Sequence, residues 1–182
     1  GYSVEPLATR LLGEGWTVRG TTRSAEKAEN LRAKGIEPIL WSGGEALGEE
    51  ITETADVLVI SVGPDEEGCP AARAVAAIGP KTVVLYLSSS GVYGDHDGDW
   101  IDEDTPCQPT SARGERRLKA EAQWRALAAQ SGARGHLCRL SGIYGPGRNA
   151  IETLRGETRG AKAGLRQRVI KPGQVFNRIH RD

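Results

Sequence analysis

The chain has 182 residues, of which 38% are hydrophobic and 26% charged, and its 24 basic residues balance its 24 acidic residues. These values suit one globular domain and exclude a strong net field that would recruit nucleic acid or an anionic membrane. No apolar run approaches the roughly 20 residues of a membrane span, and no signal-peptide pattern opens the chain. A cytoplasmic location is therefore expected. Three cysteines and three histidines are scattered, which predicts neither a disulfide framework nor a metal site.

Helical and strand patterns alternate along the chain, which predicts a doubly wound parallel α/β sheet of the Rossmann type. Strands are expected over residues 16–21, 36–41, 56–61 and 82–90, with a last strand from Gly135. Helices are expected over residues 4–12, 24–35, 70–79 and 111–130. The candidate core positions of the longest helix are Leu118, Ala122, Trp124, Leu127 and Ala128.

The opening "GYS" directly precedes the first predicted helix. In dinucleotide-binding folds, this place belongs to the glycine-rich turn, where the helix N-terminus holds the pyrophosphate. Gly1, Tyr2 and Ser3 are therefore candidate cofactor-binding residues, although one glycine could equally be an ordinary loop residue.

The strand over residues 16–21 runs into "TTRS", where the adenosine ribose of a dinucleotide would lie. An acidic residue at this point would bind the ribose hydroxyls, whereas a neutral residue followed by arginine suits a 2′-phosphate. Thr22, Arg23 and Ser24 therefore favour NADP over NAD. The alternative is that Arg23 is merely a solvated charge at a strand end.

Three consecutive serines, Ser88, Ser89 and Ser90, follow the apolar run 82–87 in "LSSSGVYGD". Ligands of open α/β sheets bind at the carboxyl ends of the strands, so these hydroxyls could face a substrate. The alternative is that they solvate an exposed strand end.

The ordered motifs "SSSGVYGD", "PTSARGERRLKAE", "RLSGIYGPGR" and "NRIH" resemble the extended short-chain dehydrogenase/reductase superfamily, nucleoside-sugar epimerase/dehydratase type. The resemblance is greatest to an atypical, NAD(P)-dependent epimerase/dehydratase-like branch. It implies a first strand before Gly1 at the centre of the sheet, with Gly1 as the second glycine of G-x-G-x-x-G. Val4 then replaces the third. We therefore expect a fragment, with an NAD(P)-binding Rossmann domain over residues 1–145 and the start of a substrate-binding lobe over residues 146–182.

The same resemblance implies roles for three residues of a catalytic site. Ser89 would hydrogen-bond the substrate oxygen. The family's Tyr-x-x-x-Lys pair is replaced by Arg113 and Arg117, and arginine cannot act as a general base because it stays protonated. Arg117 could keep the ribose-binding role, and Arg113 could polarise an oxyanion, bind an acidic substrate or be a solvated helix charge.

Two further strand ends complete the expected cofactor site. By resemblance, the backbone of Ser61, Val62 and Gly63 passes the cofactor, and Leu140 and Ser141 approach the nicotinamide.

These observations predict an NAD(P)-dependent oxidoreductase or epimerase/dehydratase acting on a polar carbonyl or sugar-like small molecule, with NADP preferred. The alternatives are a catalytically inactive NADP(H)-binding protein and a fragment that binds nothing. No nucleic-acid or membrane partner is expected. The sequence does not fix the oligomeric state, for which a homodimer is one option.

Overall fold

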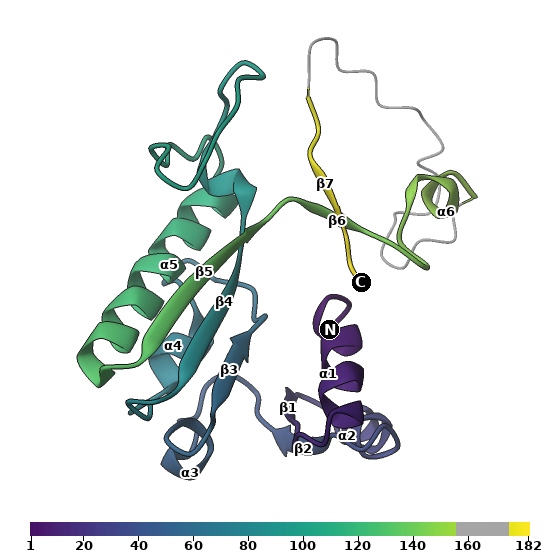
Figure 1. The fold of residues 1–182 in the computed structure, drawn as a ribbon, viewed down its shortest axis with the longest axis vertical. Coiled ribbons are helices and arrows are strands. Elements are labelled where there is room, and N and C mark those ends of the chain that lie inside the picture. The colour runs from purple at the N-terminus through teal and green to yellow at the C-terminus, as the bar shows by residue number, and fades with distance from the viewer. Residues whose placement is uncertain (156–174) are drawn as a thin grey trace.

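The computed structural model describes residues 1–155 and 175–182, and every strand pair in it is parallel. Figure 1 shows three separate sheets. Their strands are β1 (Arg19–Thr22) with β2 (Glu37–Leu40); β3 (Val57–Ile60), β4 (Val83–Ser89) and β5 (Arg134–Leu140); and β6 (Gly142–Tyr144) with β7 (Arg178–His180). The helices are α1 (Val4–Gly13), α2 (Ala25–Arg32), α3 (Glu49–Thr52), α4 (Pro70–Ala74), α5 (Ala112–Ser131) and α6 (Ala150–Arg155), and the 3₁₀ turn η1 covers Ser90–Val92.

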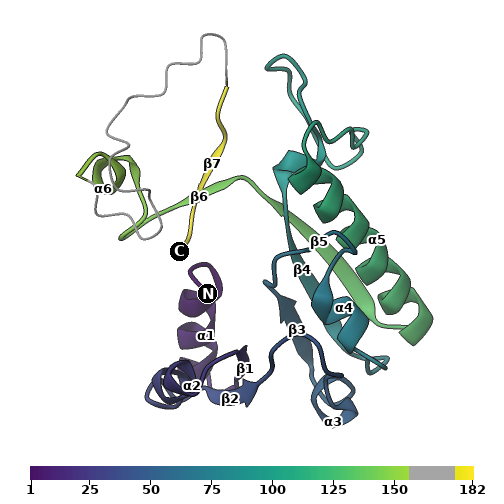
Figure 2. The ribbon, with the colours of Figure 1, turned by 180° about the vertical axis from the view of Figure 1, so that it is seen from behind.

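The three-stranded sheet carries the hydrophobic core of the described chain. α4 and α5 cover the same face of this sheet, as Figure 2 shows from behind. On β4, Val84, Tyr86 and Ser88 are buried and alternate with half-buried residues. Tyr86 stacks on Trp124 of α5, with ring centroids 6.5 Å apart. Burial of these two stacked rings fixes how α5 lies against β4.

A groove of about 740 Å³ separates β1 from β3 and is lined by residues of both strands and of α1. Among the described residues, β1 pairs only with β2 and β3 only with β4, so each strand presents an unpaired edge to the groove. Four apolar side chains of α1 line it: Val4, Leu7, Ala8 and Leu11. The groove lies at the centre of the parallel strands, where the sequence resemblance places a first strand.

Most predicted elements are confirmed, and the differences have physical reasons. The strand expected from residue 16 begins at Arg19, and Trp16 is exposed beside the groove. The helix expected over residues 70–79 ends at Ala74, because Val75 turns to extended backbone and forms a bridge with Leu47. Ala122 is exposed rather than part of the core, since it lies away from the sheet that Trp124 and Ala128 contact.

Two local predictions concern helix and strand ends. Ser24 caps α2 as expected, with its hydroxyl oxygen accepting the Lys27 N–H. The strand expected to include Ser90 stops at Ser89, because Ser90 begins the 3₁₀ turn.

In the part of the chain that the structure describes, no helix is both long and apolar enough to cross a membrane.

Candidate functional site

The carboxyl ends of β4 and β5 lie side by side and place the serines against specific partners. Ser88 is in register with Arg139, and Ser89 with Leu140. Successive strand residues point to opposite faces, so the side chains of Ser88 and Ser89 diverge. Ser88 is buried toward α5, whereas Ser89 is half-buried on the other face. The strand end therefore presents only one of these two hydroxyls away from α5.

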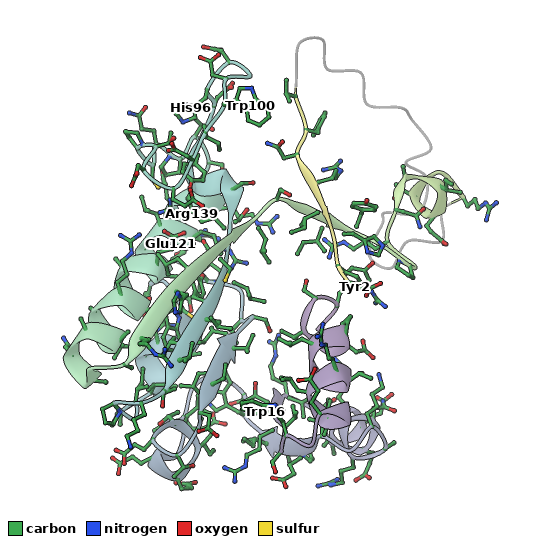
Figure 3. All side chains as sticks on the ribbon, in the orientation of Figure 1. Tyr2, Trp16, His96, Trp100, Glu121 and Arg139 are labelled. Carbon is green, nitrogen blue, oxygen red and sulfur yellow. The ribbon has the colours of Figure 1, made fainter. Side chains whose placement is uncertain are left out.

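The buried side of this strand end is an ion-pair network centred on Glu121 of α5. Glu121 is 1% exposed, and its carboxylate accepts a hydrogen bond of 2.6 Å from the Ser88 hydroxyl. The Arg139 guanidinium donates to both carboxylate oxygens, at 2.9 Å from Nη2 to Oε2 and 3.2 Å from Nε to Oε1. Figure 3 shows Glu121 and Arg139 beside each other near the end of β5. These bonds satisfy a buried carboxylate and tie α5, β4 and β5 together.

The same arginine extends the network to the turn after the serines. Arg139 Nη1 donates to the Tyr93 hydroxyl at 2.9 Å, and its guanidinium lies 4.8 Å from the centroid of the Tyr93 ring. The pKa of Arg139 is raised above its ordinary value, mainly by the hydrogen bonds to Glu121. Tyr93 is itself buried. Its hydroxyl thus packs inside the structure rather than facing a ligand.

Ser89 has a different environment. Its hydroxyl oxygen accepts a 3.2 Å bond from the Gly91 N–H and caps η1. Because the hydroxyl accepts through its oxygen, its O–H remains available to donate. α5 begins close by: a Cβ on Gly114 would lie 2.7 Å from the Gly91 carbonyl oxygen. Only a glycine allows the first turn of α5 to approach the serine turn this closely.

Arg113 and Arg117 occupy successive turns of α5 and differ in their contacts. Arg117 Nη1 donates to the Leu87 carbonyl at 2.6 Å and to the Tyr86 hydroxyl at 3.3 Å. Burial raises the pKa of Tyr86, and the Arg117 charge opposes that rise. Arg113 is exposed and has no hydrogen-bond or ion-pair partner among the described residues. Lys119 bonds the Glu66 carbonyl, away from this site.

The first residues of the chain contact its last residues, as the positions of N and C in Figure 1 indicate. The Tyr2 hydroxyl donates to the Pro146 carbonyl at 3.1 Å. The guanidinium groups of Arg148 and Arg181 lie 5.4 and 4.9 Å from the centroid of the Tyr2 ring. Gly1 is exposed, and Ser3 precedes α1 without a side-chain capping bond. The candidate pyrophosphate turn therefore sits in a positively charged setting.

The remaining predicted cofactor residues lie at other strand ends. Thr22 is the last residue of β1, and the exposed Arg23 has no partner among the described residues. The Ser24 hydroxyl oxygen is used by the α2 cap. Three residues follow β3 directly: Ser61, Val62 and Gly63.

Leu140 ends β5, and Ser141 joins it to β6. The structure thus places the predicted cofactor-binding residues at or directly after the carboxyl ends of parallel strands or at the start of α1, whereas Arg113 and Arg117 lie on α5.

The sequence did not point to Glu121 and Arg139. A glutamate within a helix rich in charged residues is indistinguishable from a solvated one by spacing alone. The available signal was Arg139 in "HLCRL": a charge within a strand expected to be buried needs a buried partner.

Comparisons with known proteins identify the family. The model of the NAD dependent epimerase/dehydratase family matches residues 69–167. The chain belongs to this family. It is 31% identical over 176 residues to protein YeeZ of Escherichia coli (strain K12), an alignment that covers 87% of the chain and 61% of YeeZ. The match confirms the predicted resemblance and the Rossmann-type fold.

Two solved structures illustrate this fold. A conserved protein of unknown function from Silicibacter pomeroyi is 40% identical, with a TM-score of 0.78 over 100% of this chain and 61% of that one. UDP-glucuronic acid 4-epimerase from Bacillus cereus, in complex with UDP-glucuronic acid and NAD, is 17% identical, with a TM-score of 0.62 over 82% of this chain and 56% of that one. The chain thus spans about three fifths of the length of YeeZ and of the Silicibacter protein.

Proposed function

We propose that the whole protein is an NAD(P)-dependent oxidoreductase or epimerase/dehydratase acting on a polar carbonyl or sugar-like small molecule. The observation that carries this proposal is the Ser89 hydroxyl, which has its O–H free at the carboxyl end of β4, beside the first turn of α5. Membership of the epimerase/dehydratase family supports an NAD-dependent reaction. The Bacillus epimerase, of similar fold, binds a nucleotide sugar and NAD, which is consistent with a sugar-like substrate.

The residues present fit a dinucleotide in two places. Arg117 Nε is buried and has no hydrogen-bond partner in the described part of the chain, so it lacks an acceptor that a ribose or substrate oxygen would supply. Arg23 is exposed at the end of β1 without an ion-pair partner among the described residues, so it can bind a 2′-phosphate. The bound nicotinamide would supply hydride transfer.

In this site, the Ser89 hydroxyl donates a hydrogen bond to the substrate oxygen and so orients the reacting carbon. This bond strengthens as negative charge develops on that oxygen. Arg117 holds the end of β4 through the Leu87 carbonyl, and its buried Nε has no acceptor among the described residues. Neither Arg117 nor Arg113 can accept a proton, so the base must be another group or a water molecule.

We further propose that NADP(H) is preferred to NAD(H), with the Rossmann domain over residues 1–145 and the substrate lobe starting at 146. Residues 156–174 of this lobe lie outside the described residues.

A charge-assisted contact between Arg23 and the 2′-phosphate of NADPH is worth about 10- to 150-fold in affinity. Fluorescence titration should therefore show Arg23→Ala weakening NADPH binding by that factor while NADH binding is unchanged. The control is Arg32→Ala, at the other end of α2. Equal losses for NADPH and NADH would refute the preference.

The second candidate is an NADP(H)-binding protein without turnover, favoured by arginine at the position of the family tyrosine. Oxidation of NADPH by the whole protein against a panel of aldehydes, ketones and nucleotide-linked keto sugars separates the two. Turnover that is lost in Ser89→Ala supports the enzyme. Tight NADPH binding without turnover or epimerisation of nucleotide sugars supports the binding protein.

A further inference from the structure

One face of α5 carries three charged residues at four-residue intervals: Arg113, Arg117 and Glu121. Residues at this spacing lie above one another on a helix. Two of them contact the end of β4, Glu121 through the Ser88 hydroxyl and Arg117 through the Leu87 carbonyl. Arg113 therefore continues the same face, one turn nearer the start of α5.

Arg113 lies in an electrostatically unfavourable place. It is in the first turn of α5, where the helix dipole favours anions, and Arg117, of like charge, is one turn away. Two neighbouring cations of α5 have partners outside this face. Arg116 forms an ion pair with Glu66 at 3.1 Å, and Lys119 donates to the Glu66 carbonyl. Arg113 has no partner among the described residues.

A second observation, independent of Arg113, indicates a missing acceptor at this point. Arg117 Nε is buried and makes no hydrogen bond with any residue that the structure describes, and a buried donor without an acceptor is costly. The first turn of α5 contacts the serine turn, because the Cβ position of Gly114 is 2.7 Å from the Gly91 carbonyl oxygen. The first turn of α5, which carries Arg113, thus lies against the turn after Ser89, and Arg117 contacts the end of the same strand through the Leu87 carbonyl.

We propose that Arg113 and Arg117 bind an oxyanion of the substrate, a carboxylate or a phosphate, next to the carbon that Ser89 orients. This inference rests on the proposed function and names its substrate class: a polar carbonyl or sugar-like molecule that carries an anionic group. An oxyanion supplies acceptors to both guanidinium groups, which bind carboxylate and phosphate in planar geometry. It also cancels the repulsion between the two arginines. The site thus uses the positions of Tyr and Lys in the family motif for charge recognition.

The test measures the thermal midpoint of the whole protein in sodium phosphate, sodium glucuronate, glucose and sodium chloride at matched ionic strength. We expect phosphate or glucuronate to raise the midpoint by at least about 2 °C over chloride, with glucose inert. A larger shift with glucuronate assigns a carboxylate, and a larger shift with phosphate assigns a phosphate group. Arg113→Ala should remove more than half of the shift, and Arg113→Lys should retain part of it.

The matched control is Arg125→Ala, which removes an exposed arginine from the middle of the same helix. It should keep the full anion shift. An equal shift in Arg113→Ala and the unchanged protein, or an equal loss in Arg125→Ala, would overturn the anion site. NADPH titration judges the proposed function separately. Arg113→Ala should bind NADPH normally. Failure of the unchanged protein to bind NADPH or NADH would refute the proposed NAD(P)-dependent enzyme, whereas the anion-induced shift of the thermal midpoint would still report on the anion site.

Discussion

Two regions of the molecule differ sharply in how well they are packed. The three-stranded half comprises β3, β4 and β5 with α4 and α5, and these elements hold most of the buried hydrophobic cluster, including Tyr86 and Trp124. The two-stranded half comprises β1 and β2 with α1 and α2. Of its helices, α1 has no buried residue and α2 only Ala28, while no residue of β1 is buried. The strands also differ in sequence, because β1 reads RGTT whereas β3 and β4 are apolar runs.

The reason for the difference is the number of neighbours that each element has. β4 lies between two strands and under α5, so its alternate residues are enclosed. β1 has one neighbour and faces the groove, and apolar residues of α1 line that groove instead of a core. Hydrophobic stabilisation scales with the apolar area removed from water, so the two-stranded half gains less of it. The residues expected to orient the substrate lie in the stable half.

The largest predicted effect is on the buried ion pair of the three-stranded half. Glu121→Ala leaves Arg139, with only 14% of its side chain exposed, without its carboxylate partner. We expect a loss of about 3–5 kcal/mol in the free energy of unfolding. The control in the two-stranded half is Glu37→Ala, which breaks the exposed pair with Arg19 and should cost at most about 1 kcal/mol. Urea denaturation of both variants measures this, and equal losses would contradict the comparison.

The next prediction compares substitutions of two adjacent serines at the end of β4, one expected to affect turnover and the other stability. Ser89→Ala should lower turnover by about 10²- to 10³-fold, because it removes a bond that strengthens in the transition state. Its effect on NADPH affinity should be small. Ser88→Ala should instead lower stability by about 1–3 kcal/mol, because it removes a donor from the buried Glu121 carboxylate. If the two variants lose turnover equally, Ser89 has no special role.

The sequence predicted features that depend on local contacts better than features that depend on distant ones. The capped start of α2 was predictable because Ser24 and Lys27 are three residues apart. The parallel strands and the position of Ser89 were predictable because apolar runs and motif order carry that information. The Glu121–Arg139 pair joins residues 18 apart on a helix and a strand, so no local pattern reveals it.

The extent of burial was also beyond local reasoning. Trp16 and Leu7 have the spacing of core residues, yet both are exposed because their side of the groove has no neighbouring strand in the described chain. In the sequence, Arg113 and Arg117 carry the same charge and stand at the two ends of one motif. Only the structure separates the arginine that holds the Leu87 carbonyl from the one without a partner.

A third prediction contrasts two helical glycines. Gly114→Ala in α5 would place a Cβ 2.7 Å from the Gly91 carbonyl oxygen and 2.8 Å from Pro109 Cβ. We expect a cost of about 1–3 kcal/mol and reduced turnover, because the serine turn must move. Gly13→Ala in α1 meets no atom within 4 Å and should stabilise by about 0.4–1 kcal/mol. Thermal unfolding of both variants gives the signs, and a stabilised Gly114→Ala would show that the close approach is not needed.

The smallest effect concerns the loop that joins the two halves. Trp41 follows β2 but packs in the hydrophobic cluster of the three-stranded half, and its Nε1 donates to the Glu45 carbonyl at 2.8 Å. The Glu45 carboxylate accepts bonds from the Ser42 hydroxyl at 2.5 Å and the Ser42 N–H at 2.9 Å. These bonds, the hydroxyl bond first, lower the pKa of Glu45 from 4.5 to about 2.

Because this pKa is depressed in the folded state, the loop's contribution to stability is complete above pH 4.5 and is lost as the pH falls toward 2. NMR titration of the Glu45 side chain should give a midpoint near 2, and Ser42→Ala should move it toward 4.5. The Trp41 indole N–H signal should change over the same pH range as Glu45, since both belong to one loop. A midpoint near 4.5 in the unchanged protein would mean that Ser42 does not hold the carboxylate.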